Sequence, residues 1–480
     1  MTRDLITQLR WGPTPSAFLR RCIAEACFAP RRRMAAGAVF LPMLLALAFN
    51  VSVVRAQPAA PIRLTLADAV ARAFEASHRL AETRARRTGA EATVRLRQTA
   101  ERPTASAGAG YSRTNHVDEF GVPQAGGGFR TLYPDIPDNV ITRLSFQWPI
   151  YTSGRADALE RAAAAEVGAL GSELDAARAD LRLETVRAYW SVATAAEAVR
   201  VLEESVSRAD AQVNDARQRL TVGLVPPNEV LSFEAQRSNE QLQLIDARTL
   251  GESSLIDLRR LIGADPEARI ELADNLEAPG AFTPVSPGVS TALVDEALKQ
   301  RPERQVLTFR IASAEARERA AAAGNKPTLG FAGGLDYANP NPRIFPRAGK
   351  WQTSWDLAVN VSWPIFDSGR TKAEVAEAQA AVTAARERLL DLDAMVAADV
   401  RQRSLDLQSS QAAVRAADDG VRAAAEARRV AGERFAVGAA TPTDVLVAQD
   451  ALLTAQLART RALAGVRLAE ARLTRSLGRF

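Results

Sequence analysis

Trp148-Pro149-Ile150-Tyr151-Thr152-Ser153-Gly154-Arg155 recurs as Trp363-Pro364-Ile365-Phe366-Asp367-Ser368-Gly369-Arg370. The offset between the two octets is 215 residues, from Gly154 to Gly369. The same offset relates four further pairs: Gly223 and Gly438, Pro227 and Pro442, Leu231 and Leu446, and Gly263 and Gly478. Loops vary in length between copies of a repeat, whereas long rods keep theirs. The constant offset therefore predicts two copies of one rod-bearing unit.

A long stretch without proline follows each Trp-Pro pair, from Ile150 to Val225 and from Ile365 to Thr441. Each stretch holds roughly 70 residues, which make about 100 Å of α-helix at 1.5 Å per residue. A glycine and then a proline come next, and these suit the end of one helix and the start of another. We therefore predict two long helical hairpins, over 151–263 with its tip at 223–228 and over 366–478 with its tip at 438–443.

Apolar and other residues alternate with period two ahead of each octet. Trp355, Leu357, Val359 and Val361 alternate with Ser354, Asp356, Ala358 and Asn360 in the second copy. This pattern predicts strands near 104–112, 140–149, 328–337 and 353–363. Strands of about ten residues with one apolar face and aromatic ends are typical of a transmembrane β-barrel. The alternative is a small soluble sheet with one face on a core.

Helices are also expected ahead of the strands, over 64–100 and over 291–323. Residues 264–290 contain four prolines and link repeat 1 (57–263) to repeat 2 (291–480) as an equatorial segment. The predicted fold class is therefore mainly α with a transmembrane β part, in two tandem repeats. Long Ala-rich rods with a slender apolar stripe need neighbouring helices, so we expect the chain to oligomerise.

The first 56 residues have the pattern of a secretory signal peptide. Arg31-Arg32-Arg33 precede an apolar run from Met34 to Val54, and Val54-Arg55-Ala56 has the form of a cleavage site. The alternative is an N-terminal membrane anchor, since roughly 20 apolar residues can span a bilayer. The segment before the apolar run is long for a signal peptide, which suggests an over-extended start.

The composition argues against catalysis and nucleic-acid binding. The formal charge is +5, but residues 1–56 carry eight Arg against two acids, which is +6 and leaves −1 for the remainder. A near-neutral chain offers no basic face to nucleic acid. Cys22 and Cys27 both precede residue 57, and His78 and His116 are the only histidines. A Ser-His-Asp triad or a tight metal site is therefore not expected, and we predict no enzyme, no cofactor and no metal.

The two octets and the two tip motifs together resemble the TolC-like outer membrane efflux protein family. The tip motif (Leu/Phe)-x-Val-Gly-x-x-x-Pro-x-(Glu/Asp)-Val-Leu also occurs twice, and the resemblance covers nearly all of the chain after Gln57. It implies a homotrimer in the cell outer membrane that extends into the periplasm. Each subunit would give four strands to a twelve-stranded barrel in the lipid, and its helices would form a periplasmic α-barrel.

The function implied by this resemblance is a passive exit duct of a tripartite efflux or type I secretion system, gated at the periplasmic helix tips. Its partners would be a periplasmic adaptor protein, an inner-membrane pump and outer membrane lipid, with no nucleic acid. The rival class is a periplasmic coiled-coil adaptor or scaffold, which also uses long helical hairpins. An adaptor would carry lipoyl-like strands around one hairpin. A further alternative keeps the fold and changes the cargo from drugs or metals to proteins.

The resemblance also assigns roles to individual positions. Asp444 falls on the family's pore-lining acid at the constriction, and Glu229 is its counterpart in the first copy. The alternative for Asp444 is a helix-start acid favoured by the helix macrodipole. The adaptor-docking tips would comprise Val222, Gly223, Pro227, Leu231, Val437, Gly438, Pro442 and Leu446. The barrel-to-helix junction would comprise Trp148, Pro149, Gly154, Trp363, Pro364 and Gly369.

Three tip positions depart from the family pattern. Val447, Ala440 and Phe435 stand where some members have a second acid, an arginine and a tyrosine. We therefore expect fewer charged and hydroxyl contacts to hold the closed state of this protein.

Overall fold

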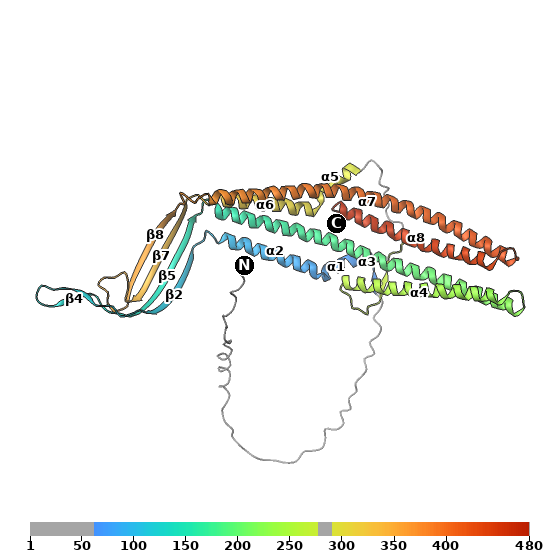
Figure 1. Ribbon diagram of the computed structural model, residues 1–480, viewed down its shortest axis with the longest axis horizontal. Coiled ribbons are helices and arrows are strands. Elements are labelled where there is room, and N and C mark those ends of the chain that lie inside the picture. Colours follow the sequence, from blue (N-terminus) through green and yellow to red (C-terminus); the bar gives the residue numbers. More distant parts are fainter. Residues whose placement is uncertain (1–61, 277–289, 480) are drawn as a thin grey trace, which may run out of the picture. The chain divides into compact units, whose positions relative to one another are not determined.

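The computed structural model describes residues 62–276 and 290–479 (Figure 1). The expected signal peptide, residues 1–56, lies outside the described residues, as do residues 277–289 of the expected linker. Within the two described ranges, no helix combines the length and the apolar character needed to cross a membrane.

Two similar series of elements follow one another along the chain. The first contains β1 (Ile62–Leu64), α1 (Leu66–Ala76), α2 (His78–Gln98), β2 (Thr104–Arg113), β3 (Phe120–Pro123), β4 (Phe129–Tyr133), β5 (Asp138–Tyr151), α3 (Arg155–Thr221) and α4 (Pro227–Leu261). After β6 (Ile270–Leu272), the second contains α5 (Ser290–Gln300), α6 (Pro302–Ala322), β7 (Thr328–Asn339), β8 (Gln352–Ser362), α7 (Arg370–Ala436) and α8 (Pro442–Ser476). The predicted class, mainly helical with two repeats and four long strands, is confirmed.

The single helix expected over 64–100 is wrong, because the chain forms β1, α1 and α2 there. Ser77 separates the two helices: its backbone is extended (φ −73°, ψ 109°), and its hydroxyl accepts a hydrogen bond from the Leu80 amide at 3.3 Å. A serine in this position satisfies an amide at the start of the following helix and ends the preceding one.

The single helix expected over 291–323 is wrong for a related reason, because α5 and α6 are separate. Pro302 is the first residue of α6, and Arg301 before it is extended (φ −65°, ψ 124°). A proline ring clashes with a helical conformation in the preceding residue, which favours a break in the helix at Arg301. The Arg301 side chain is almost buried, and it donates to the Ser476 carbonyl and pairs with Asp399.

The four long strands form one antiparallel sheet in the order β2-β5-β7-β8. Arg143 lies opposite Asp336, and Leu335 lies opposite Trp355, so one face of the sheet carries charged residues and the other carries apolar residues. On β8, the apolar face carries the well-exposed side chains Trp355, Leu357, Val359 and Val361. Among the residues described, β2 and β8 each have one edge without a partner strand.

Two shorter sheets were not expected from the sequence. β1 pairs in parallel with β6, with Leu64 opposite Leu272, and so ties the start of repeat 1 to the segment after α4. β3 and β4 form a hairpin inside the loop between β2 and β5. Strands this short leave no clear period-two signal.

The helices form two antiparallel hairpins, α3–α4 and α7–α8, which lie side by side (Figure 1). α3 and α7 have 67 residues each, and α4 and α8 have 35 each. α3 packs against α2, α4, α6 and α8, and α7 packs against α6 and α8. Many of the buried residues of α3 are alanines, which permit close helix approach. The part of each long helix nearest the strands is therefore covered by α2 or α6, and the part nearest the tip by α4 or α8.

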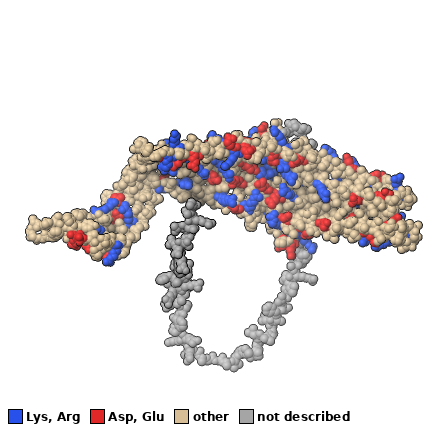
Figure 2. Space-filling model, in the orientation of Figure 1, with Lys and Arg blue, Asp and Glu red and all other residues tan. Residues whose placement is uncertain are grey.

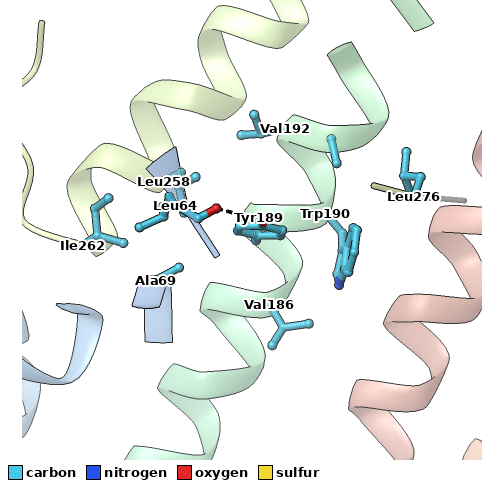
Figure 3. Close-up of a cluster of buried hydrophobic side chains, with 10 residues drawn as sticks. Leu64, Ala69, Val186, Tyr189, Trp190, Val192, Leu258, Ile262 and Leu276 are labelled. Atoms are coloured by element: carbon cyan, nitrogen blue, oxygen red, sulfur yellow. Dashed lines mark hydrogen bonds between the residues drawn. The ribbon is translucent and has the colours of Figure 1, made fainter. Parts of the chain in front are cut away.

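The core around Tyr189 lies where α3 meets β1, α1 and the end of α4 (Figure 3). Tyr189 is fully buried, and its hydroxyl lies 3.1 Å from the Leu64 carbonyl oxygen and 2.9 Å from Asp274 Oδ2. Burial raises the pKa of Tyr189 to about 12, so the hydroxyl stays protonated and able to donate at physiological pH. This residue therefore connects α3 to the short β1–β6 sheet.

Candidate functional site

The strand-to-helix junction has the same backbone form in both repeats. Gly154 and Gly369 have positive φ angles of 79° and 85° and stand directly before α3 and α7. Pro149 lies opposite Gly330, where the β5–β7 register shifts, and Pro364 follows the end of β8. Proline has no amide hydrogen for a sheet. The ladder is therefore interrupted at Pro149 and resumes with Tyr151 opposite Leu329, whereas β8 ends before Pro364.

The two junction tryptophans make matching contacts. Trp148 Nε1 donates to the Glu101 carbonyl at 3.0 Å, and Trp363 Nε1 donates to the Asn325 carbonyl at 3.1 Å. Both acceptors lie two residues before the proline that precedes β2 or β7. In each repeat, the indole therefore connects the end of the second strand to the segment just before the first strand.

The two helical tips end in the same turn. Gly223 and Gly438 have φ angles of 73° and 74°, and the amide of the following residue bonds to a carbonyl five positions back, Leu224 to Arg219 and Ala439 to Arg434. This is a Schellman cap, which favours glycine in the left-handed conformation. Pro227 and Pro442 then begin α4 and α8.

The two tip acids differ in their surroundings. The Thr441 amide donates to Asp444 Oδ2 at 2.8 Å and the Asp444 amide donates to Thr441 Oγ1 at 3.3 Å, which forms a capping box. The Thr441 hydroxyl also donates to Asp444 Oδ2 at 2.7 Å. The hydrogen bond from the Thr441 amide, and after it the bond from the Thr441 hydroxyl, lowers the pKa of Asp444 below its ordinary value of 3.8. Glu229 lacks this arrangement because Pro226 stands at the matching cap position. Asp444 thus has a helix-start role, and its exposed carboxylate stays charged at neutral pH.

An aromatic contact joins the tips of the two hairpins. Phe435 on α7 and Phe233 on α4 have ring centroids 6.3 Å apart and planes inclined by 66°. The Arg219 guanidinium of α3 lies 5.4 Å from the Phe435 centroid. Phe435 therefore joins the hairpins by apolar and cation–π contact. The sequence singled out Phe435 but missed Phe233 and Arg219, whose proximity depends on how the helices pack.

The expected docking residues differ in exposure. Val222, Leu231 and Val437 are all at least 63% exposed. Leu446, in contrast, packs against the buried tip cluster that contains Phe233. The exposed valines and leucine can therefore contact another molecule, whereas Leu446 supports the tip itself.

A buried polar pair behind the tips was missed in the sequence. Glu240 on α4 and Gln449 on α8 are 0% and 1% exposed, and Gln449 Nε2 donates to Glu240 Oε1 at 3.4 Å. The signal was available, since Val230, Phe233, Glu240 and Leu244 follow one heptad stripe and one of them is an acid.

Nowhere in residues 62–276 and 290–479 do three His, Cys, Asp or Glu gather in a way that could hold a metal ion.

Comparison with known proteins gives a family match over both repeats. The family described as "Outer membrane efflux protein" matches residues 69–264 and 293–479. The chain is 27% identical over 282 residues to outer membrane protein TolC of Vibrio cholerae, covering 57% of this chain and 62% of that protein. It is 26% identical over 277 residues to protein CyaE of Bordetella pertussis, covering 57% of each. The alignments thus span about three fifths of the length of these curated relatives.

Solved structures share the fold over a larger part of the chain. The outer-membrane channel OprN superposes with a TM-score of 0.70 at 19% identity, covering 86% of this chain and 89% of that one. The Campylobacter jejuni CmeC outer membrane channel gives 0.72 at 18% identity, covering 86% and 85%. The likeness to solved structures therefore includes the strands as well as the helical hairpins.

Proposed function

Because the chain belongs to the outer membrane efflux protein family, we propose that it is a passive exit duct of a tripartite efflux or type I secretion system. It is an outer membrane protein with a helical part that extends into the periplasm. One observation carries the proposal: in each repeat, the same octet motif joins a pair of amphipathic strands to a long helical hairpin. The duct performs no catalysis, and its opening is controlled at the tips around Gly223 and Gly438.

A homotrimer is the assembly that the open edges of the sheet support. β2 and β8 are the outermost of the four strands, and open edges are avoided in a membrane, where backbone groups find no water. Pairing β8 of one subunit with β2 of the next would close twelve strands into a barrel. The apolar face with Leu357 and Val359 would then contact lipid, and the polar face with Arg143 and Asp336 would line the lumen.

Exposed apolar side chains on the helices support the same assembly. They lie on α4, at Leu231, Leu242, Ile245, Leu250 and Ile256, and on α7, at Leu390, Met395, Leu405 and Val430. α4 and α7 are the outer helices of the set, since α3 and α8 lie between them. Contact of α7 with α4 of the next subunit would bury both groups, and three copies would enclose the helical conduit.

The adaptor protein and the pump are proposed as partners at the tips. Val222, Leu231 and Val437 offer exposed apolar contacts beside the Schellman turns, where adaptor hairpins would dock. The family match and the two-faced strands favour the duct over the rival adaptor function. Purification from outer membranes should give a heat-modifiable trimer that conducts ions in planar bilayers. A water-soluble monomer without conductance would contradict the duct and support the adaptor.

Replacing Asp444 by Ala is expected to raise single-channel conductance and to weaken blockage by trivalent cations. Three Asp444 carboxylates around the narrow entrance would attract cations and repel anions. Hydrogen bonds from Thr441 lower the pKa of Asp444 in the folded chain. The charged carboxylate therefore stabilises the fold at pH values above the ordinary pKa of the group, and this stabilisation is lost as the pH falls through the lowered pKa. Planar-bilayer recordings at neutral pH with and without a trivalent cation measure the effect.

Thr441→Ala is the matched control for Asp444→Ala. It removes the hydroxyl of the capping box and leaves the carboxylate, so it tests the structural role without the charge. Conductance and trivalent blockage close to wild type are expected for this variant. Equal behaviour of the two variants would remove Asp444 from the constriction and leave it as a helix cap.

A further inference from the structure

The segment between β7 and β8, residues 340–351, turns back onto the polar face of the sheet. Asn341 is 1% exposed, and its amide nitrogen lies 3.0 Å from both the Gln352 carbonyl and Ser354 Oγ. Its side-chain oxygen accepts a hydrogen bond from the Arg343 amide at 2.9 Å. The first turn of the loop is therefore fixed against β8 and directs Arg343 toward the sheet.

Arg343 completes a cluster of four charges on that face. Arg143 on β5 contacts Asp336 at 3.2 Å and Asp356 at 3.3 Å, and Arg343 Nη2 contacts Asp356 Oδ1 at 2.8 Å. The Asp336 side chain is 2% exposed. Gly334 leaves the room for this, since a Cβ there would lie 2.6 Å from Arg143 Nη2 and 2.8 Å from Asp356 Oδ1. Gly334 therefore leaves room for the Arg143–Asp356 contact, to which Arg343 of the loop adds a second cation.

A second arginine attaches the loop to β4 and β5. Arg347 donates to Tyr133 Oη at the end of β4 and to Asn139 Oδ1 on β5, both at 2.7 Å. Its guanidinium also lies 5.0 Å from the centroid of the Tyr133 ring. The loop leaves the sheet between β7 and β8 and is bound again at β5. It therefore crosses the strand ends on the polar face rather than projecting away from them.

Charged side chains gather at this end of the sheet, remote from the helices, while the visible middle of the strands carries few (Figure 2). The polar face is the face that would line the lumen, so an inference from this loop rests on the proposed duct. We propose that the 340–351 loop forms a second constriction, at the outer mouth of the duct. Arg343 and Arg347 set the size limit for solutes there, because they hold the loop over the lumen. In a trimer, three such loops converge on one opening.

The test is polymer exclusion by the full chain in planar bilayers, with neutral polyethylene glycols of graded size added from the outer side. The Arg343→Ala/Arg347→Ala double variant should have higher conductance and admit larger polymers than wild type. Arg347→Ala alone, which keeps the Arg143–Asp336–Asp356 contacts, should shift the limit in the same direction by less. Arg130→Ala is the matched control, since it removes the same charge at an exposed position of β4, outside residues 340–351.

The outcomes separate the inference from the function on which it rests. Wild-type protein that forms no channel overturns the duct itself. Wild-type channels with an exclusion limit that neither arginine variant changes overturn the constriction and leave the duct intact. If the double variant fails to assemble, Arg347→Ala decides, and a limit equal to that of Arg130→Ala overturns the proposal.

Discussion

Tyr189→Ala is expected to lower the free energy of unfolding by about 3–5 kcal/mol, the usual cost of removing a buried aromatic side chain. Tyr189 is fully buried at the centre of the core that joins α3 to β1 and the end of α4. Its hydroxyl also serves three groups: it can donate to the Leu64 carbonyl or to Asp274 Oδ2, and it accepts from the Asp274 amide at 3.2 Å. Loss of the ring therefore leaves both a cavity and unsatisfied polar atoms.

Tyr189→Phe separates these two contributions. It keeps the packing and removes the hydroxyl, so a loss of about 1–3 kcal/mol is expected from the unsatisfied partners alone. Urea unfolding of detergent-solubilised protein, followed by circular dichroism, measures both variants. If Tyr189→Ala destabilised the protein no more than Tyr189→Phe, the ring would not be part of a rigid core.

Val359→Arg is expected to prevent assembly into the outer membrane. Val359 is 66% exposed on the apolar face of β8, and in the proposed barrel that face contacts lipid. An arginine facing lipid near the bilayer midplane costs about 2–4 kcal/mol in a β-barrel, and a trimer would carry three such charges. The expected result is a large loss of heat-modifiable trimer in outer-membrane fractions, measured by fractionation and gel migration.

Asn360→Arg is the matched control for this substitution. Asn360 is the next residue of β8 and is likewise exposed, but period-two alternation places it on the polar face. The same charge would then point into a water-filled lumen, so trimer yield close to wild type is expected, with altered ion selectivity. Equal loss of trimer in both variants would contradict the assignment of the two faces.

Much of the candidate site was predictable from local sequence. The tip glycines and prolines announce a helix end and a helix start, and the octets mark the points where strands become helices. The breaks at Ser77 and Arg301 were missed although the signals were local: a serine cap in one case and Pro302 in the other. Both breaks are therefore encoded by residues next to them in the sequence.

Other parts of the site depend on contacts between distant residues. Glu240 meets Gln449 across 209 positions, and Arg143 meets Asp336 across 193. Such contacts depend on how one helix is rotated against another and on the register of strand pairing. A pattern of neighbouring residues constrains neither strongly.

The amino-acid sequence by itself determined the two repeats, the positions of the long strands and the lengths of the long helices. Hydrophobic periodicity, glycine and proline affect the backbone locally, so their effects can be read from neighbouring residues. Folding decided which side chains meet: the Tyr189 hydroxyl with Asp274, Phe435 with Phe233, and Arg343 with Asp356. The physical reason is that burial and ion pairing act through space, so only packing in three dimensions selects these partners.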